Sequence, residues 1–262
     1  MTGAEAGARR SVGEPAPVVT AVDPLASPIW PGLARDHLTD APIVFDEAVR
    51  VILPPVNEDQ TQVPIAVDAR RLGHVDELVV FGELNPFPVA MRLRPGASPP
   101  FASFRMRIEQ GTPIRAAALK DGSWRVGGDY LDAAGGGCSA KPKVVSAVDW
   151  SSVGEIRGRA WRESGGLLRM RLRVVHPMDN GLHAEPLFIL ERLAIAADGR
   201  DILEVELKEP IAANPTLTFL VEDTGADRLR VAARDTDGRR CEATLPTPAA
   251  STLSSGAGEG LR

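Results

Sequence analysis

Short segments in which apolar and polar side chains alternate run through the first half of the chain. Residues 101–108 are the clearest case, with Phe104 on one side of an extended chain and Arg105 on the other. The Asp121-Gly122 pair between two such segments is typical of a hairpin turn. Pro64 predicts that its strand lies at the edge of a sheet. The predicted strands are 49–53, 63–67, 76–81, 89–93, 101–108, 114–119 and 124–126, preceded by a short helix over 29–38.

The second half repeats this pattern after a segment without it. Two strands flank the turn at 163–166, and Asp237-Gly238 predicts the last hairpin. The predicted strands are 153–161, 167–175, 188–195, 202–207, 217–222, 229–234 and 239–245. Two sets of short strands at this spacing predict an all-β protein with two immunoglobulin-like β-sandwich domains in tandem. The expected domains are 29–138 and 151–246, joined by a linker at 139–150.

The two ends of the chain lack these patterns. Residues 1–28 contain a basic pair, Arg9-Arg10, of the kind that precedes the apolar core of a secretory signal. Glu14 and two prolines interrupt the apolar run that should follow it. We therefore expect a disordered leader rather than a working signal peptide. Residues 247–262 are rich in Thr, Ser, Gly, Ala and Pro, a composition typical of a disordered tail.

Composition and charge argue against several kinds of binding partner. The 30 basic and 35 acidic residues give a formal charge of −5 without a basic block, which argues against nucleic acid and anionic membranes. No apolar run is long enough to span a membrane. The two cysteines form no CxxC or Cys/His cluster with the spacing of a zinc site, so we expect no metal.

The strongest candidate for chemistry is Cys138, which follows Gly135, Gly136 and Gly137. A thiol on a thin glycine backbone suits a carrier of covalently attached groups, since such an arm can enter a narrow site. Lys141 lies three residues on and would lower the thiol pKa by its charge. Two alternatives stay open: a glycine turn that contains a small buried residue, and a disulfide with Cys241.

A second unusual segment, His176-Pro177-Met178-Asp179-Asn180-Gly181, has two interpretations. His176, Met178 and His183 are residue types that bind copper. The favoured interpretation is a strand end followed by a proline turn, with a role in contacting the other domain. The remaining polar candidates are read as structural or solvated: Asn85, Asn214, Glu83, Arg105 and Arg107.

These segments together resemble a known pair of proteins. The first half resembles SoxY, the carrier subunit of thiosulfate oxidation, in 63–67, 85–90, 104–107 and the glycine–cysteine loop. The second half resembles its partner SoxZ in 176–181, 212–215 and 235–238. The ordered set, over about residues 40–246, resembles the fused quinoprotein dehydrogenase-associated SoxYZ-like carriers.

The resemblance implies a carrier that acts with partner enzymes and is not itself an enzyme. Cys138 is the matching position for a covalent sulfur adduct, and no other cofactor is implied. Expected partners are sulfur-oxidation enzymes or a quinoprotein dehydrogenase, in the periplasm, and the two halves are expected to pair within the chain.

One departure from the family pattern favours a different function. SoxY ends in Gly-Gly-Cys-Gly-Gly, whereas here Ser139-Ala140-Lys141-Pro142 and a whole domain follow the cysteine. The loop is therefore held at both ends and reaches less far than a free tail. The alternative is a non-catalytic docking module of a periplasmic quinoprotein dehydrogenase.

Overall fold

A computed structural model describes residues 19–139, 150–182 and 186–248. It contains one short helix, α1 (Trp30–His37), and one 3-10 turn, η1 (Arg70–Leu72). The strands of the first half are β1 (Val19–Thr20), β2 (Ile43–Asp46), β3 (Arg50–Ile52), β4 (Val63–Asp68), β5 (Glu77–Gly82), β6 (Val89–Arg94), β7 (Phe101–Met106), β8 (Thr112–Lys120) and β9 (Ser123–Leu131). Those of the second half are β10 (Ile156–Glu163), β11 (Leu167–Val174), β12 (Leu190–Ala197), β13 (Arg200–Leu207), β14 (Thr216–Glu222), β15 (Arg228–Asp235) and β16 (Arg240–Pro246). The helix described here is too short to cross a membrane.

Except for β1 and β2, which were not predicted, the strands lie where the alternating pattern predicts them, within about five residues at each end. β8 and β9 meet at Asp121 and Gly122, which both have positive φ (48° and 70°), as a two-residue hairpin of the favoured twist requires. The prediction made from Pro64 differs from the structure. β4 has β7 on one side and β3 on the other, so the prediction of an edge strand is wrong. The register explains how proline is accommodated, because β3 pairs with residues 66–68 and stops before Pro64.

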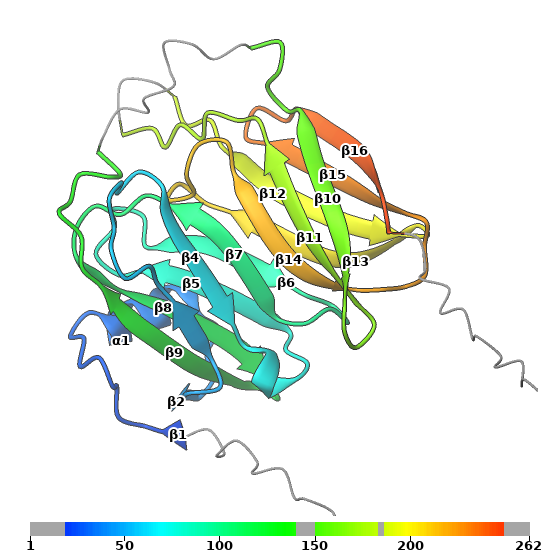
Figure 1. Cartoon of the computed structure of the whole chain (residues 1–262). Helices are drawn as coiled ribbons and strands as arrows, with labels where there is room; N and C mark the ends of the chain where they lie inside the picture. The colour runs from blue at the N-terminus through cyan, green and yellow to red at the C-terminus, as the bar shows by residue number, and fades with distance from the viewer. Residues whose placement is uncertain (1–18, 140–149, 183–185, 249–262) are drawn as a thin grey trace, which may run out of the picture.

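Two sheets pack face to face, and both run through both halves of the chain (Figure 1). The larger sheet has the order β1-β2-β9-β8-β5-β6-β13-β12-β15-β16, and the smaller one has β10-β11-β14-β7-β4-β3. The halves join at two antiparallel pairs. β6 pairs with β13 over four residue pairs, from Arg94↔Glu204 to Met91↔Leu207, and β7 pairs with β14 at two.

A single apolar core fills the space between the sheets. It contains Phe104 and Met106 from the first half beside Phe219 and Leu207 from the second. The two β-sandwich halves of the predicted fold are present, and they share both sheets and the core. Of the expected linker at 139–150, residues 140–149 lie outside the described residues.

A third layer covers the outer face of the larger sheet in the first half. Trp30 and Ala34 of α1 pack there with Phe81 of β5 and Trp124 of β9. Trp30 meets Phe81 edge-on, with ring centroids 5.3 Å apart. Since alternate residues of β5 enter the two cores, this strand is buried on both faces, which explains its continuous apolar run.

Residues 19–28 differ from the disordered leader that their composition predicts. Asp23 accepts two hydrogen bonds from the Arg115 guanidinium (2.8 and 2.7 Å), and Ser27 donates to Glu83. Arg115 and Glu83 are themselves buried and paired, so the interpretation of Glu83 as a solvated residue is wrong. A buried arginine needs carboxylate partners, and the leader segment supplies one of them. Residues 1–18 and 249–262 lie outside the described residues.

Candidate functional site

The glycine–cysteine loop returns from the end of β9 and lies along the segment that follows β7. The Gly136 amide donates to the carbonyl of Glu109 (2.7 Å), and the Gly137 amide donates to that of Ile108 (2.9 Å). Ile108 also bonds to a second segment, because its own amide donates to the carbonyl oxygen of Gln60 at 2.8 Å. The loop is therefore bound as an extra strand-like segment at this end of the molecule.

The Glu109 carboxylate fixes the tip of the loop. One oxygen, Oε2, accepts hydrogen bonds from the backbone amides of Cys138 (3.0 Å) and Ser139 (2.9 Å). The other, Oε1, accepts from the Ser139 hydroxyl at 2.8 Å. Hydrogen bonds to a charged acceptor are stronger than neutral ones, so Glu109 is the main polar anchor of the cysteine.

The loop glycines serve close packing in this arrangement. A Cβ atom on Gly137 would lie 2.2 Å from Gln60 O and 2.4 Å from Ile108 O, so only glycine fits between these carbonyls. Gly135 and Gly136 have φ of 102° and 83°, which other residues rarely adopt. The expectation that these glycines form a free arm is wrong for this structure, where the backbone is held on both sides.

Cys138 is buried, with 1% of its surface exposed. Its thiol lies 3.5 Å from the carbonyl oxygen of Arg107, to which it donates. Burial and, to a smaller extent, the negative charge of Glu109 raise the thiol pKa to about 12 against the opposing effect of Arg107. The prediction that the thiol faces solvent is thus wrong in this structure. In the bound position the thiol stays protonated near neutral pH and is a poor nucleophile.

Both halves of the chain hold the cysteine. The Asn180 side-chain amide donates to Cys138 O (3.1 Å), and the Arg107 guanidinium donates to Met178 O (2.7 Å). The prediction that the 176–181 segment contacts the other half is confirmed by these bonds. Arg107 is 3% exposed, so its interpretation as a solvated residue is wrong: β7 ends at Met106, and the alternation that placed Arg107 outside ends with it.

Asn85 holds the segment that carries Arg107 and Glu109, a role that sequence reasoning missed. Its amide nitrogen donates to Arg107 O (2.9 Å), and its oxygen accepts from the Glu109 amide (2.9 Å). An asparagine that satisfies a donor and an acceptor two residues apart holds an extended segment as a neighbouring strand would. Its position before Pro86 suggested only a turn, because nothing local indicates a partner more than twenty residues away.

Other predicted residues are not brought to the thiol. Lys141 and His183 lie outside the described residues. Both cysteines are free, so the alternative disulfide between Cys138 and Cys241 is not formed. The described residues contain no cluster of three or more His, Cys, Asp or Glu side chains placed to hold a metal.

His176 is a buried, neutral side chain next to this interface. Its Nδ1 accepts a hydrogen bond from the Met178 amide (3.1 Å), and its ring lies 4.4 Å from that of Phe188. Its Nε2 is 3.9 Å from Asp235, too far for a hydrogen bond, and is buried without a partner. Burial and the positive charge of Arg239 together lower the pKa of His176 to about 4.

This histidine makes the stability of the protein depend on pH. The unfolded chain takes up a proton at His176 near pH 6.5 and the folded chain only near pH 4. The contribution is therefore complete above about pH 6.5 and is lost as pH falls towards 4. Between pH 7 and pH 5 we expect the free energy of unfolding to drop by about 2 kcal/mol. Urea unfolding of His176→Asn, which keeps an acceptor for Met178, is expected to lack this drop. An equal drop in the variant would contradict the assignment.

The fold and site define a β protein in which two joined halves enclose one thiol. Comparisons with known proteins agree with this class. The family model described as "Sulfur oxidation protein SoxY" matches residues 34–138, and "Sulphur oxidation protein SoxZ" matches residues 156–246. The chain is therefore a fusion of a SoxY family domain with a SoxZ family domain. The SoxY match ends at Cys138 itself.

Comparison with solved structures gives matches of low TM-score. The sulfur carrier protein SoxY from Chlorobium limicola f thiosulfatophilum is 18% identical, over 40% of this chain and 94% of that one, with a TM-score of 0.36. A glycosyl hydrolase family 2 member from Bacteroides cellulosilyticus DSM 14838 is 14% identical, over 75% and 28%, with a TM-score of 0.23. Bovine butyrophilin is 12% identical, over 76% and 98%, with a TM-score of 0.19. No curated protein matches the chain in sequence.

Proposed function

We propose that the chain is a covalent carrier of sulfur compounds and that Cys138 is the attachment site. The observation that carries this proposal is the enclosure of one thiol by both carrier domains. Glu109 and Arg107 of the SoxY half hold the cysteine and its surroundings, and Asn180 of the SoxZ half bonds directly to the cysteine carbonyl. Cys241, by contrast, is half-buried on β16 with no such enclosure described around it.

The chemistry of attachment follows from the thiol. Joining Cys138 to a reduced sulfur compound forms an S–S bond and releases the thiol proton and two electrons, so a loading partner must accept those electrons. Exchange with a polysulfide needs no such partner, because the sulfur of a polysulfide is already partly oxidised. The Cys138 thiolate attacks the polysulfide, keeps part of its sulfur as an S–S bond and releases a shorter polysulfide. A thiol reductant reverses either bond. The chain supplies the attachment atom, and partner enzymes supply the redox and hydrolytic steps.

The buried position serves as the resting state of the carrier. A thiol with a pKa of about 12 is protected from oxidation and from stray electrophiles. Loading requires the loop to leave its place, which breaks the bonds to Glu109 and Asn180 and returns the pKa to its usual range. Lys141 is the cation nearest to Cys138 in the sequence, and its role in stabilising the thiolate stays a prediction.

The setting of this carrier is inferred from its families. We propose that it acts in the periplasm with sulfur-oxidation enzymes or with a quinoprotein dehydrogenase, and that the SoxY and SoxZ halves form the pair that separate subunits form elsewhere. Fusion keeps the two halves at high effective concentration, so the pair does not depend on the amount of protein present. The joined strands β6–β13 and β7–β14 support this pairing.

Loading with polysulfide tests the attachment site. Purified protein incubated with sodium polysulfide is expected to gain the mass of whole sulfur atoms, removable by a thiol reductant. Cys138→Ser should gain none, and the matched variant Cys241→Ser should gain as much as the wild type. Sulfur that loads onto Cys138→Ser but not onto Cys241→Ser would place the adduct on the wrong cysteine and end the proposal.

A second function, a docking module of a quinoprotein dehydrogenase, is favoured by one observation: the thiol is buried and protonated. In that function the cysteine is a structural residue of the interface. Cys138→Ser would then leave association with the dehydrogenase and its activity unchanged, whereas the carrier function requires loss of activity with association kept.

A further inference from the structure

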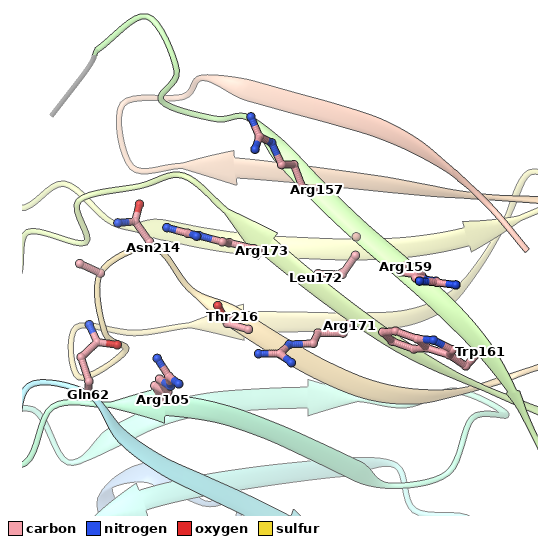
Figure 2. A pocket seen from close by; sticks show the side chains of 12 residues that line it. Gln62, Arg105, Arg157, Arg159, Trp161, Arg171, Leu172, Arg173, Asn214 and Thr216 are labelled. Carbon is pink, nitrogen blue, oxygen red and sulfur yellow. The ribbon is translucent and has the colours of Figure 1, made fainter. Parts of the chain in front are cut away.

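The outer face of the smaller sheet carries a groove lined by five arginines. It has a volume of about 530 Å³ and lies over β10, β11, β14 and the end of β7. We call it the arginine groove, formed by Arg105, Arg157, Arg159, Arg171 and Arg173 with Trp161 at one end. Figure 2 shows the arginines of β11 and Arg105 of β7 on either side of Thr216. None of the residues that line the groove is acidic.

The arginines face one another without carboxylates between them. In the β10–β11 pair, Arg157 lies opposite Arg173, and Arg159 lies opposite Arg171. Like charges directly opposite in a sheet destabilise it. Arg157 pairs with Glu155 at 2.7 Å, but within the described part of the chain no acidic side chain is recorded at ion-pair distance from Arg105, Arg159, Arg171 or Arg173. A concentrated charge that the fold does not neutralise indicates a ligand that does.

The shape and chemistry of the groove favour a protein ligand. Its charges come from three strands along an open face, which is more than one small dianion can contact. Trp161, 38% exposed, lies beside Arg159, whose guanidinium carbon is 5.5 Å from the ring centroid. Aromatic residues and arginine are the side chains enriched at protein interfaces. Nucleic acid is disfavoured, because the whole chain carries a charge of −5 and would repel a polyanion outside the groove.

One end of the groove adjoins the two segments that hold the cysteine. Arg105 is two residues before Arg107, whose carbonyl contacts the Cys138 thiol. At the same end, Asn214 lines the groove and accepts a hydrogen bond from the His176 amide, in the segment that leads to Met178 and Asn180. A protein bound in the groove would therefore place its neighbouring surface next to the point where the cysteine loop must leave.

We propose that the arginine groove docks an acidic segment of the partner protein that works on Cys138. The choice of partner rests on the proposed carrier function, but the binding of an acidic segment does not. The charges also steer an acidic partner to this face during encounter, an effect that salt screens.

The test measures binding of a fluorescently labelled poly-L-glutamate peptide to the full chain by anisotropy at low salt. Wild type is expected to bind, and binding should weaken steeply with added NaCl. Arg171→Glu combined with Arg173→Glu should weaken it by about tenfold or more. The matched control is Arg192→Glu with Arg230→Glu, the same charge change on exposed positions of β12 and β15, expected to stay within about twofold of wild type.

Each other outcome overturns the proposal. Equal weakening in the control would mean that net charge alone governs binding, and tighter binding of duplex DNA than of the peptide would make the partner a nucleic acid. Displacement of the peptide by an equal charge of sulfate would make the groove a small-anion site.

The groove variant should fold well, because each glutamate then faces an arginine across the β10–β11 pair. Should it not fold, Arg171→Gln with Arg173→Gln is the second variant, with a smaller expected loss. Cys138→Ser should bind the peptide normally, which separates this test from that of the carrier function.

Discussion

Gly137→Ala is expected to make the Cys138 thiol react with iodoacetamide at least about a hundredfold faster at pH 8. The methyl group would overlap the carbonyl oxygens of Gln60 and Ile108, so the loop cannot keep its bound position. Once the thiol is in water, its pKa falls from about 12 towards the usual value, which raises the thiolate fraction by roughly a thousandfold. The lower nucleophilicity of the less basic thiolate offsets part of that gain. Alkylation kinetics followed by intact mass give the rate.

Gly136→Ala is the matched control for this experiment. A Cβ on Gly136 meets no atom within 4 Å, so the substitution adds only the strain of a positive φ. That strain costs about 1–2 kcal/mol and predicts a rise in rate of roughly tenfold. If Gly137→Ala alkylates as slowly as wild type, the packing of the glycine between two carbonyls is not what shields the thiol.

Glu83→Gln is expected to lower the free energy of unfolding by about 3–5 kcal/mol and the melting temperature by about 10 °C. The Glu83 side chain is fully buried and pairs with the buried guanidinium of Arg115. Glutamine leaves the charge of Arg115 without this partner in the interior, and only Asp23 remains to compensate it. Urea and thermal unfolding of the full chain measure both quantities.

Two further variants separate the ion pair from the anchoring of residues 19–28. Asp23→Asn should cost less than Glu83→Gln, because Asp23 is partly exposed and Arg115 keeps its buried partner. Combining Glu83→Gln with Arg115→Met should recover part of the loss, since no uncompensated charge is then buried. A Glu83→Gln protein as stable as wild type would mean that the pair contributes little.

Most of the fold could be predicted because its information is local. Alternation and turn residues such as Asp121-Gly122 specify most of the strands and hairpins by themselves, although β1 and β2 were not predicted. How the halves meet is not local information. β6 and β13 pair across more than a hundred residues of sequence, and nothing in either strand indicates its partner. The tandem arrangement was therefore predicted correctly as two β halves, without the continuity of their sheets.

Cys138 can be singled out from the sequence as a candidate, but its environment cannot. Glycines beside Cys138 indicate mobility when read alone, yet the same absence of side chains lets the backbone pass between the carbonyls of Gln60 and Ile108. Arg107 and Asn85 were read as solvated and structural because their partners are distant in sequence. Burial of a polar side chain depends on such long-range contacts, which a single sequence does not display.

If Cys138 carries a sulfur compound as proposed, the intact mass of the protein isolated from its own cells without reductant will show an adduct. Peptide mapping is expected to place this adduct on Cys138, and a thiol reductant is expected to remove it. An unmodified Cys138 in cells that are actively oxidising sulfur compounds would contradict the proposal.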